Sequence, residues 1–340
     1  MTNKNIQKEN MDINQTSVSK ANLYNVIIIG GGCAGLTAST WCGRAGLTHL
    51  VFSGTKCDAS SMLSTTSIVE NFPGITSIDG KEIIKKLKKQ ALLYGGKILE
   101  KCIVKVDFTV KPFKVWDREG IEYQASSIIL ATGSIPNRLK LENEDKLWGK
   151  YISTCVCCDA PAFKNKRVVV LGGGDSSLEE AIGLTRFTNK VTLIHRKNTF
   201  RASVALQKKV QKNSKINVVK NMTVQSINMK DNKLVSITCL NNESKQSIEI
   251  KTDALFYALG FCPNTNLVKD KLELDEGGYI VKKSSKHFEN VTSIDGVFCA
   301  GDCSTQNYRQ AVLAVADGVK ASLDVNKYLH EMHIVEDEFF

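Results

Sequence analysis

The sequence has 340 residues, of which 42% are hydrophobic and 24% charged, and its formal net charge is +10. This length and composition fit a globular chain of two domains, and no stretch reaches the roughly 18 apolar residues that a membrane span needs. The positive residues are scattered and aromatic residues make up only 7%, so we expect neither a nucleic-acid nor a membrane partner. The densest basic run, residues 81–89, has helical spacing and is interpreted as a solvated helix face.

The first 22 residues are polar and lack the apolar segment of a secretory signal. We expect residues 1–22 to form a disordered tail and the protein to be cytoplasmic. The eleven cysteines show no spacing typical of a disulfide framework or a paired zinc site. No metal site is therefore expected.

Residues 24–36, YNVIIIGGGCAGL, predict a buried parallel strand, a glycine turn and the start of a helix. Gly30, Gly32 and Gly35 have the spacing of a dinucleotide-binding fingerprint, in which the pyrophosphate lies on the helix N-terminus. The acid that normally ends the next strand and binds a ribose is absent, since Ser53 occupies that position and the nearest acid is Asp58.

Residues 153–161, STCVCCDAP, place Cys155 and Cys158 at a spacing that can close a small reducible disulfide. Asp159 follows directly and is well placed to exchange a proton with a leaving thiolate. Three buried structural thiols are the alternative interpretation. A redox role is favoured because one nucleotide-binding unit precedes the motif and a second, described next, follows it. A nicotinamide, a flavin and a dithiol form an electron path.

A second unit repeats the first at residues 167–178, RVVVLGGGDSSL, where Gly172 and Gly174 are followed by Ser177 in place of a third glycine. The next strand ends at His195, Arg196 and Lys197, with Arg201 close behind. Positive groups at this point favour a 2′-phosphate and hence NADPH. A solvated basic turn is the alternative.

Each unit continues to an apolar strand ending in glycine, at 127–133 and 254–260, and one more strand follows at 295–303 with a helix at 308–329. We predict that this last strand and helix return to complete the first unit. The predicted fold is α/β with two Rossmann-like dinucleotide-binding domains of the three-layer ββα type, one inserted into the other. Their predicted limits are 23–138 with 268–340, and 139–267.

Several segments, in this order and spacing, resemble the low-molecular-weight thioredoxin reductases, a class II group of pyridine nucleotide-disulfide oxidoreductases, over nearly all of residues 22–330. They are VENFPG (69–74), SIILATGS (127–134), CVCCDA (155–160), GGGDSSLEEA (172–181), HRKNTFRAS (195–203), LGFCPNT (259–265) and GVFCAGDCSTQNYRQAVLAVADG (296–318). The resemblance implies a homodimeric enzyme that passes hydride from NADPH through FAD to the Cys155–Cys158 disulfide and then reduces thioredoxin. It also implies that one domain rotates against the other during turnover.

The resemblance assigns roles to individual residues. The FAD-binding residues it implies are Gly30, Gly32, Gly35, Asn71, Asp302, Arg309, Gln310 and Ala311. The NADPH-binding residues it implies are Gly172, Gly174, Ser176, His195, Arg196, Lys197 and Arg201. Cys158 is expected on the flavin side of the disulfide, with Asp159 as its acid–base partner and Cys155 as the other thiol.

The sequence departs from the family on the FAD side and inside the redox motif. Ser53 stands where a glutamate is usual, Ser60, Ser61 and Met62 replace Gly-Gly-Gln, and Cys157 adds a third thiol. Two alternatives remain open: a flavin-dependent dithiol oxidase of the same fold, and a degenerate, non-catalytic nucleotide-binding paralogue. The other cysteines are expected in the core, although Cys33 and Cys303, at predicted cofactor loops, are expected to be accessible.

Overall fold

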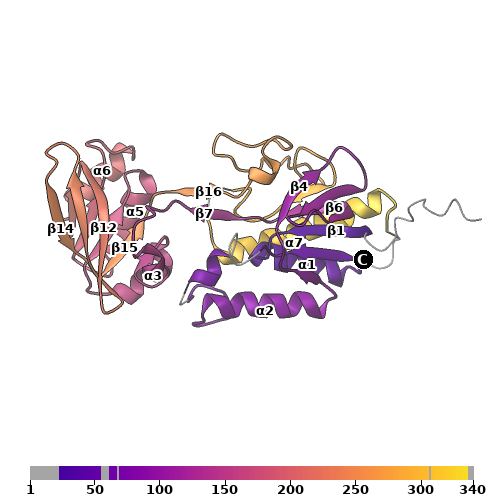
Figure 1. Cartoon of the computed structure of the whole chain (residues 1–340), viewed down its shortest axis with the longest axis horizontal. Helices are drawn as coiled ribbons and strands as arrows, with labels where there is room; N and C mark the ends of the chain where they lie inside the picture. The colour runs from indigo at the N-terminus through magenta and orange to yellow at the C-terminus, as the bar shows by residue number, and fades with distance from the viewer. Residues whose placement is uncertain (1–22, 55–60, 67–68, 306–307, 336–340) are drawn as a thin grey trace, which may run out of the picture.

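The structure is a computed structural model and describes residues 23–54, 61–66, 69–305 and 308–335. The predicted N-terminal tail, Asp58 and Ser60 lie outside these residues. The chain forms two lobes connected by two extended segments (Figure 1).

The first lobe is built on a parallel sheet in the order β3-β2-β1-β6, with β17 on the far side of β6. These strands are β1 (Leu23–Ile29), β2 (His49–Phe52), β3 (Lys97–Leu99), β6 (Glu122–Leu130) and β17 (Val297–Cys299). The register pairs Ile29 with both Phe52 and Leu130. The carboxyl ends of three strands therefore meet at one edge, where the glycine turn begins.

Alternate residues of β1 face two different layers. Val26 and Ile28 pack under α1 (Cys33–Arg44) and α7 (Ala311–Glu331), whereas Ile27 and Ile29 pack toward an antiparallel pair. This pair is β4 (Ile103–Asp107) and β5 (Phe113–Asp117), which extends the sheet from β6. The β-branched strands are thus buried on both faces, as a three-layer fold requires.

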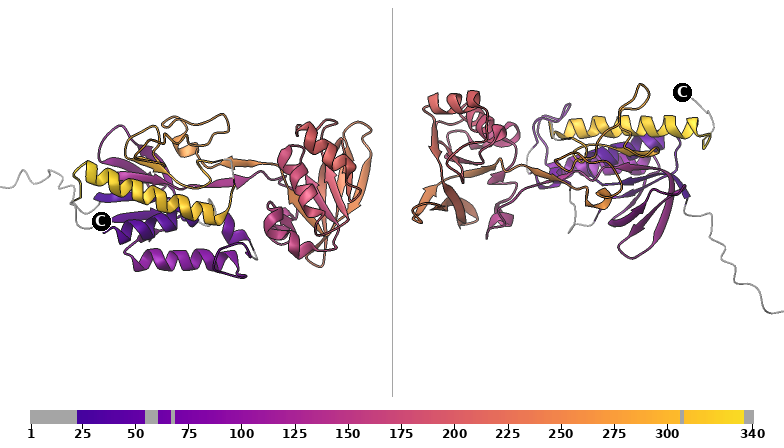
Figure 2. Two further views of the ribbon diagram at one scale, coloured as in Figure 1. Left: turned by 180° about the vertical axis from the view of Figure 1, so that it is seen from behind. Right: turned by 90° about the horizontal axis from the view of Figure 1, so that it is seen from above.

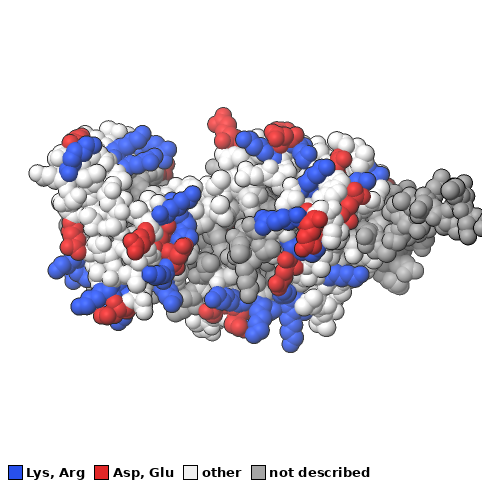
Figure 3. Space-filling view, in the orientation of Figure 1, with Lys and Arg blue, Asp and Glu red and all other residues white. Residues whose placement is uncertain are grey.

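The helix α2 (Gly80–Leu93) packs beside α1 and contains the predicted basic run. Asp79 caps it by accepting a hydrogen bond from the Lys81 backbone N–H at 2.7 Å. Ile83 is buried while most of the lysines are exposed, which confirms the solvated helix face. On the face shown in Figure 3, positive side chains lie among negative ones.

The second lobe repeats the three layers around a parallel sheet in the order β11-β10-β9-β15-β8. The strands of this sheet are β8 (Ile152–Ser153), β9 (Val168–Leu171), β10 (Val191–Ile194), β11 (Ile216–Val219) and β15 (Ala254–Tyr257). Val168 and Val170 face the helical side, and Val169 and Leu171 face the antiparallel sheet. The helices are α5 (Asp175–Leu184) and α6 (Val204–Lys212); the antiparallel sheet is β12 (Met222–Lys230), β13 (Lys233–Asn241) and β14 (Ser247–Lys251). Two short helices, α3 (Glu144–Leu147) and α4 (Val156–Asp159), lie before β9.

The two lobes are linked by β7 (Ser134–Pro136) and β16 (Phe261–Pro263), which pair antiparallel (Figures 1 and 2). After β16 the chain returns to the first lobe, where β17 pairs with β6 and α7 packs against α1. The domain limits at 138/139 and 267/268 stay a prediction.

The last helix begins later than expected, at Ala311 rather than Tyr308. Tyr308 has a positive φ of 49° and Gln310 is extended, so neither can continue a right-handed helix. Among the described residues, no helix is both long and apolar enough to cross a membrane.

Candidate active site

A cavity of about 310 Å³ lies where the carboxyl edge of the first sheet faces the second lobe. Segments far apart in the chain meet in its wall. The predicted site residues that line it are Gly30, Gly32, Asn71, Cys155, Cys158, Asp159, Asp302, Arg309, Gln310 and Ala311. Residues assigned to FAD and the cysteine pair therefore share one cavity.

The glycine turn after β1 is tightly packed. A Cβ on Gly30, whose φ is +130°, would lie 2.0 Å from the Ala131 carbonyl oxygen, and one on Gly35 would lie 1.9 Å from the Gly30 carbonyl oxygen. Gly32 meets nothing closer than the Ser61 hydroxyl at 3.6 Å. Gly30 and Gly35 close the turn and Gly32 leaves space above the start of α1, the arrangement that admits a pyrophosphate.

Asp302 and Arg309 also line this cavity. Burial raises the pKa of the Asp302 carboxyl, and the charge of Arg309 opposes that rise. The Arg309 guanidinium donates to the Tyr279 hydroxyl at 2.6 Å and lies 4.4 Å from the centre of the Phe261 ring. Neither Tyr279 nor Phe261 is marked by a sequence pattern, since only the fold brings them to Arg309.

The short helix α4 carries the cysteine motif, and Cys155 and Cys158 form a disulfide. Burial raises the pKa of Asp159. The Ser153 hydroxyl donates to the Asp159 carboxylate and accepts from the Cys155 backbone N–H at 3.0 Å. Ser153, which no sequence pattern marked, thus connects the Asp159 carboxyl group to the backbone of the disulfide motif by hydrogen bonds.

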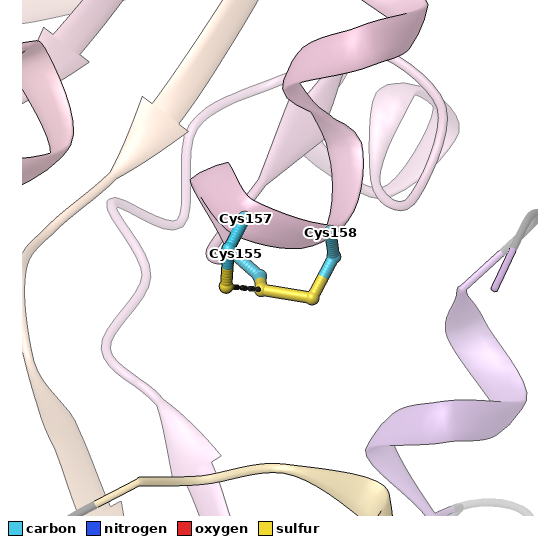
Figure 4. Close-up of side chains that lie close together, drawn as sticks. All are labelled: Cys155, Cys157 and Cys158. Carbon is cyan, nitrogen blue, oxygen red and sulfur yellow. Dashed lines mark hydrogen bonds between the residues drawn. A yellow bond between two sulfur atoms is a disulfide. The ribbon is translucent and has the colours of Figure 1, made fainter. Parts of the chain in front are cut away.

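Two amide side chains of the first lobe contact this motif. Asn71 Nδ2 lies 3.7 Å from Cys158 Sγ and donates to Gln310 Oε1 at 3.1 Å. Gln310 Nε2 in turn lies 3.7 Å from the sulfur of Cys157. Cys157 is exposed, and its Sγ is 3.4 Å from Cys155 Sγ (Figure 4).

The second glycine turn lies outside this cavity. Ser176 is exposed in the first turn of α5, and a Cβ on Gly174 would meet nothing within 4 Å. Ser177 fits the third position because its hydroxyl donates to the Gly174 carbonyl at 2.7 Å. A Cβ on Gly172 would lie 2.6 Å from the Ala258 carbonyl oxygen, so this turn is also closely packed and differs from the first in lying outside the cavity.

The predicted basic cluster divides into two parts. The His195 ring is only 7% exposed, stacks on Phe200, and fills the place of a Cβ on Gly173. Burial lowers its pKa, so it supports the turn as a neutral ring. Arg196, Lys197 and Arg201 are exposed.

A further basic residue, Lys220, follows β11 at the same edge of the sheet. Its Nζ lies 4.9 Å from the centre of the Phe200 ring. Lys220 was not predicted as a site residue, because nothing in its neighbourhood along the chain marks a site. Its position directly after β11, a parallel strand paired with β10, could have indicated it, since the carboxyl ends of parallel strands share an edge.

The remaining cysteines differ in part from expectation. Cys33 and Cys303 are buried, not accessible, and burial raises the pKa of Cys33 to about 12. They lie at the cofactor loops but point into the packed interior, where a thiol is inert. Cys262, expected in the core, is exposed on β16.

Comparisons with known proteins agree with this geometry. The family model described as pyridine nucleotide-disulphide oxidoreductase matches residues 24–318. A thioredoxin reductase from Dictyostelium discoideum is 39% identical over 323 residues, which cover 93% of this chain and 100% of the relative.

Two solved structures each align with 91% of this chain, and each alignment includes 99% of the solved chain. The thioredoxin reductase from Giardia duodenalis is 37% identical, with a TM-score of 0.84. That of Lactococcus lactis, in what is described as its FR conformation, is 30% identical, with a TM-score of 0.61. The chain belongs to the pyridine nucleotide-disulphide oxidoreductase family and, within it, to the thioredoxin reductases.

Proposed function

We propose that this thioredoxin reductase uses FAD and NADPH and that the Cys155–Cys158 disulfide is its redox centre. The observation that carries the proposal is that the disulfide lines the same cavity as the first glycine turn. Electron transfer between a flavin and a disulfide requires the two to lie in contact. A disulfide that served only to stabilise the fold would not need this position.

The residues of the cavity fit FAD. A pyrophosphate fits the space above Gly32, at the N-terminus of α1. The first backbone N–H groups of this 12-residue helix lack intrahelical partners and can donate to the phosphates. Asp302 is half-buried in the wall, where it can accept from sugar-alcohol hydroxyl groups. A flavin bound there supplies two-electron chemistry between a nicotinamide and a disulfide.

The protein side of the reaction is a change in two sulfur atoms and one carboxyl group. Two electrons enter through Cys158, the S–S bond breaks, and both sulfurs end as thiols after taking up two protons. Asp159 is suited to deliver a proton, since burial raises its pKa and favours the protonated form. Ser153 is the positioning residue that holds its carboxyl group.

The second lobe is proposed to bind NADPH. The 2′-phosphate would be bound by Arg196, Lys197 and Arg201. The pyrophosphate would lie at Gly172, Gly174 and Ser176, and His195 would support the turn. These residues do not line the cavity at the disulfide. A nicotinamide bound at the second turn therefore requires the lobes to reorient, and the paired strands β7 and β16 are the place for the hinge. The lower TM-score to the FR conformation, at the same coverage, supports such a motion.

The proposed substrate is a thioredoxin, as the names of the relatives state for those proteins. A homodimer is proposed from apolar side chains left exposed on the helices of the first lobe, Trp41 on α1 and Leu313 and Leu323 on α7. A cytoplasmic location stays a prediction.

The test is NADPH oxidation by the flavin-loaded protein with a purified thioredoxin and a chromogenic disulfide. We expect turnover in the wild type and its loss in Cys158→Ser, with flavin reduction by NADPH preserved in the variant. Bound flavin without turnover with any thioredoxin would contradict the proposal and favour a non-catalytic paralogue. Dithiol-dependent oxygen consumption without NADPH would indicate the dithiol oxidase.

A further inference from the structure

Cys157 lies between the two members of the redox disulfide in the chain and next to them in space. Its Sγ is 3.4 Å from Cys155 Sγ, while Cys155 is bonded to Cys158 at 2.05 Å. Figure 4 shows the sulfur of Cys155 in contact with both others, and all three sulfur atoms lie within 4.8 Å of one another. Cys157 is exposed and carries no disulfide.

This arrangement brings the three groups of a thiol–disulfide exchange into contact. The attacking thiolate must approach one sulfur of the disulfide from the side opposite the leaving sulfur, and it must be accessible. Cys157 is the attacking group, Cys155 the sulfur attacked, and Cys158 the leaving group. The 3.4 Å from Cys157 Sγ to Cys155 Sγ is within the range of a near-attack distance, about 3–3.5 Å. The sulfurs of Cys157 and Cys158 lie within 4.8 Å of each other, so the three are not in line and the attack requires a rotation of the Cys157 side chain.

Two amides of the first lobe orient the attacking and leaving sulfurs. Gln310 Nε2 lies 3.7 Å from Cys157 Sγ, and Asn71 Nδ2 lies 3.7 Å from Cys158 Sγ. The hydrogen bond from Asn71 Nδ2 to Gln310 Oε1 at 3.1 Å connects the two amides. The exchange geometry therefore belongs to the arrangement in which the motif contacts the first lobe.

From this geometry we infer that Cys157 is a third redox-active thiol, which moves the disulfide from Cys155–Cys158 to Cys155–Cys157. The bond between Cys157 Sγ and Cys155 Sγ forms as the Cys155–Cys158 bond breaks, and the electron pair leaves on Cys158. Cys157 loses one proton and Cys158 gains one. The step is an isomerisation, so it needs no oxidant or reductant.

The consequence rests on the proposed role of Cys158 as the entry point for electrons. In the isomer, Cys158 is a thiol although the centre as a whole is oxidised. The enzyme in that form accepts no electrons through Cys158 until the exchange reverses. Cys157 thus regulates how much of the oxidised enzyme is ready for reduction.

The test is differential alkylation of the oxidised, FAD-loaded protein without NADPH. Light iodoacetamide is added first; after denaturation and reduction, heavy iodoacetamide labels the remaining cysteines, and tandem mass spectrometry locates each label. We expect the light label on Cys157 and on Cys158 but not on Cys155, which stays bonded in both isomers. In Cys157→Ser the light label on Cys158 should fall at least tenfold.

Light label confined to Cys157 in the wild type would overturn the inference. Light labelling of Cys155 equal to that of Cys158 in fully oxidised protein would also overturn it, because Cys155 would then not stay bonded in both isomers. Cys262→Ser, which removes an exposed thiol on β16, is the matched control and should leave the pattern unchanged.

A second variant tests the same bond without relying on trapping by alkylation. Oxidised Cys158→Ser should contain a Cys155–Cys157 disulfide that is absent from the double variant Cys157→Ser, Cys158→Ser. Two free thiols at Cys155 and Cys157 after oxidation would contradict the inference. None of these readouts uses turnover, so a failure of the reductase assay is distinguishable from a failure of the exchange.

Discussion

The two glycine turns share a sequence pattern but have different surroundings. In the first, a Cβ on Gly30 or Gly35 would lie within about 2 Å of backbone carbonyl oxygens, and the turn lines a cavity shared with the disulfide. The second turn is also closely packed, since a Cβ on Gly172 would lie 2.6 Å from the Ala258 carbonyl oxygen, but it lies outside that cavity and the basic side chains beside it are exposed. The first, here called the closed turn because it lines the cavity, suits a cofactor that stays bound. The second, the open turn, suits one that enters and leaves each cycle.

The largest expected effect comes from filling the closed turn. Gly35→Ala places a methyl group 1.9 Å from the Gly30 carbonyl oxygen, so the protein should lose its flavin and about 1–3 kcal/mol of stability, as overpacking typically costs. Gly174→Ala is the control for the glycine-to-alanine change itself, because nothing lies within 4 Å of its Cβ. Flavin absorbance and thermal unfolding measure both; equal losses in the two variants would show that the close contact at Gly35 is not the cause.

Charge at the open turn should have the next largest effect. Arg196→Ala should raise the KM for NADPH by roughly 10- to 100-fold, the value of one hydrogen bond to a charged group. The KM for NADH should change little, since NADH lacks the 2′-phosphate. If both constants rise together, Arg196 is not recognising the phosphate.

A smaller effect is expected on the helix that follows the open turn. Burial raises the pKa of Glu180 to about 8 from its ordinary value of 4.5, and its Oε2 is buried without a hydrogen-bond partner among the described residues. Because the folded state holds this proton more tightly than the unfolded state, the group lowers stability increasingly as pH rises from about 4.5 to 8.

The free energy of unfolding of Glu180→Gln should therefore exceed that of the wild type at pH 8 by about 1–2 kcal/mol, after allowing for partial solvent contact, with no difference near pH 4. Thermal unfolding at several pH values measures this difference. Glu142→Gln is the control, since Glu142 is exposed and far along the chain from Glu180. A gain in stability that does not depend on pH would show that the charge of Glu180 is not the cause.

The smallest expected effect concerns the missing acid of the closed turn. Ser53 follows β2, and its hydroxyl donates to the Leu99 carbonyl at 3.2 Å. Ser53→Glu should tighten FAD binding by a few-fold, about 1 kcal/mol, because a carboxylate at this strand end accepts from the ribose hydroxyl groups. Ser53→Gln should gain less; equal gains would show that the charge plays no part.

The repeated strand, turn and helix units were predictable because each is local. A continuous β-branched strand followed by closely spaced glycines leaves few alternatives, and both units formed at the expected residues. The cysteine pair and its acid were likewise adjacent in the sequence, and Cys155 and Cys158 form the expected disulfide.

The missed features depend on contacts between distant segments. Tyr279 reaches Arg309, and Asn71 reaches Cys158, only because the sheets and linking strands bring them together. Cys33 and Cys303 were misjudged for the same reason, since a loop position does not reveal which way a side chain points. The contact of Cys157 with Cys155 could be read from the spacing only as a possibility, and its geometry required the fold.

An anaerobic titration of the oxidised, FAD-loaded protein with NADPH, with thiols counted at each step, tests electron transfer from the flavin to the disulfide directly. We expect the first equivalent to generate two new thiols per chain, with Cys155 and Cys158 both reduced. If the flavin bleaches with the first equivalent and no thiol appears, the flavin does not pass electrons to this disulfide, and Cys155–Cys158 is not the redox centre.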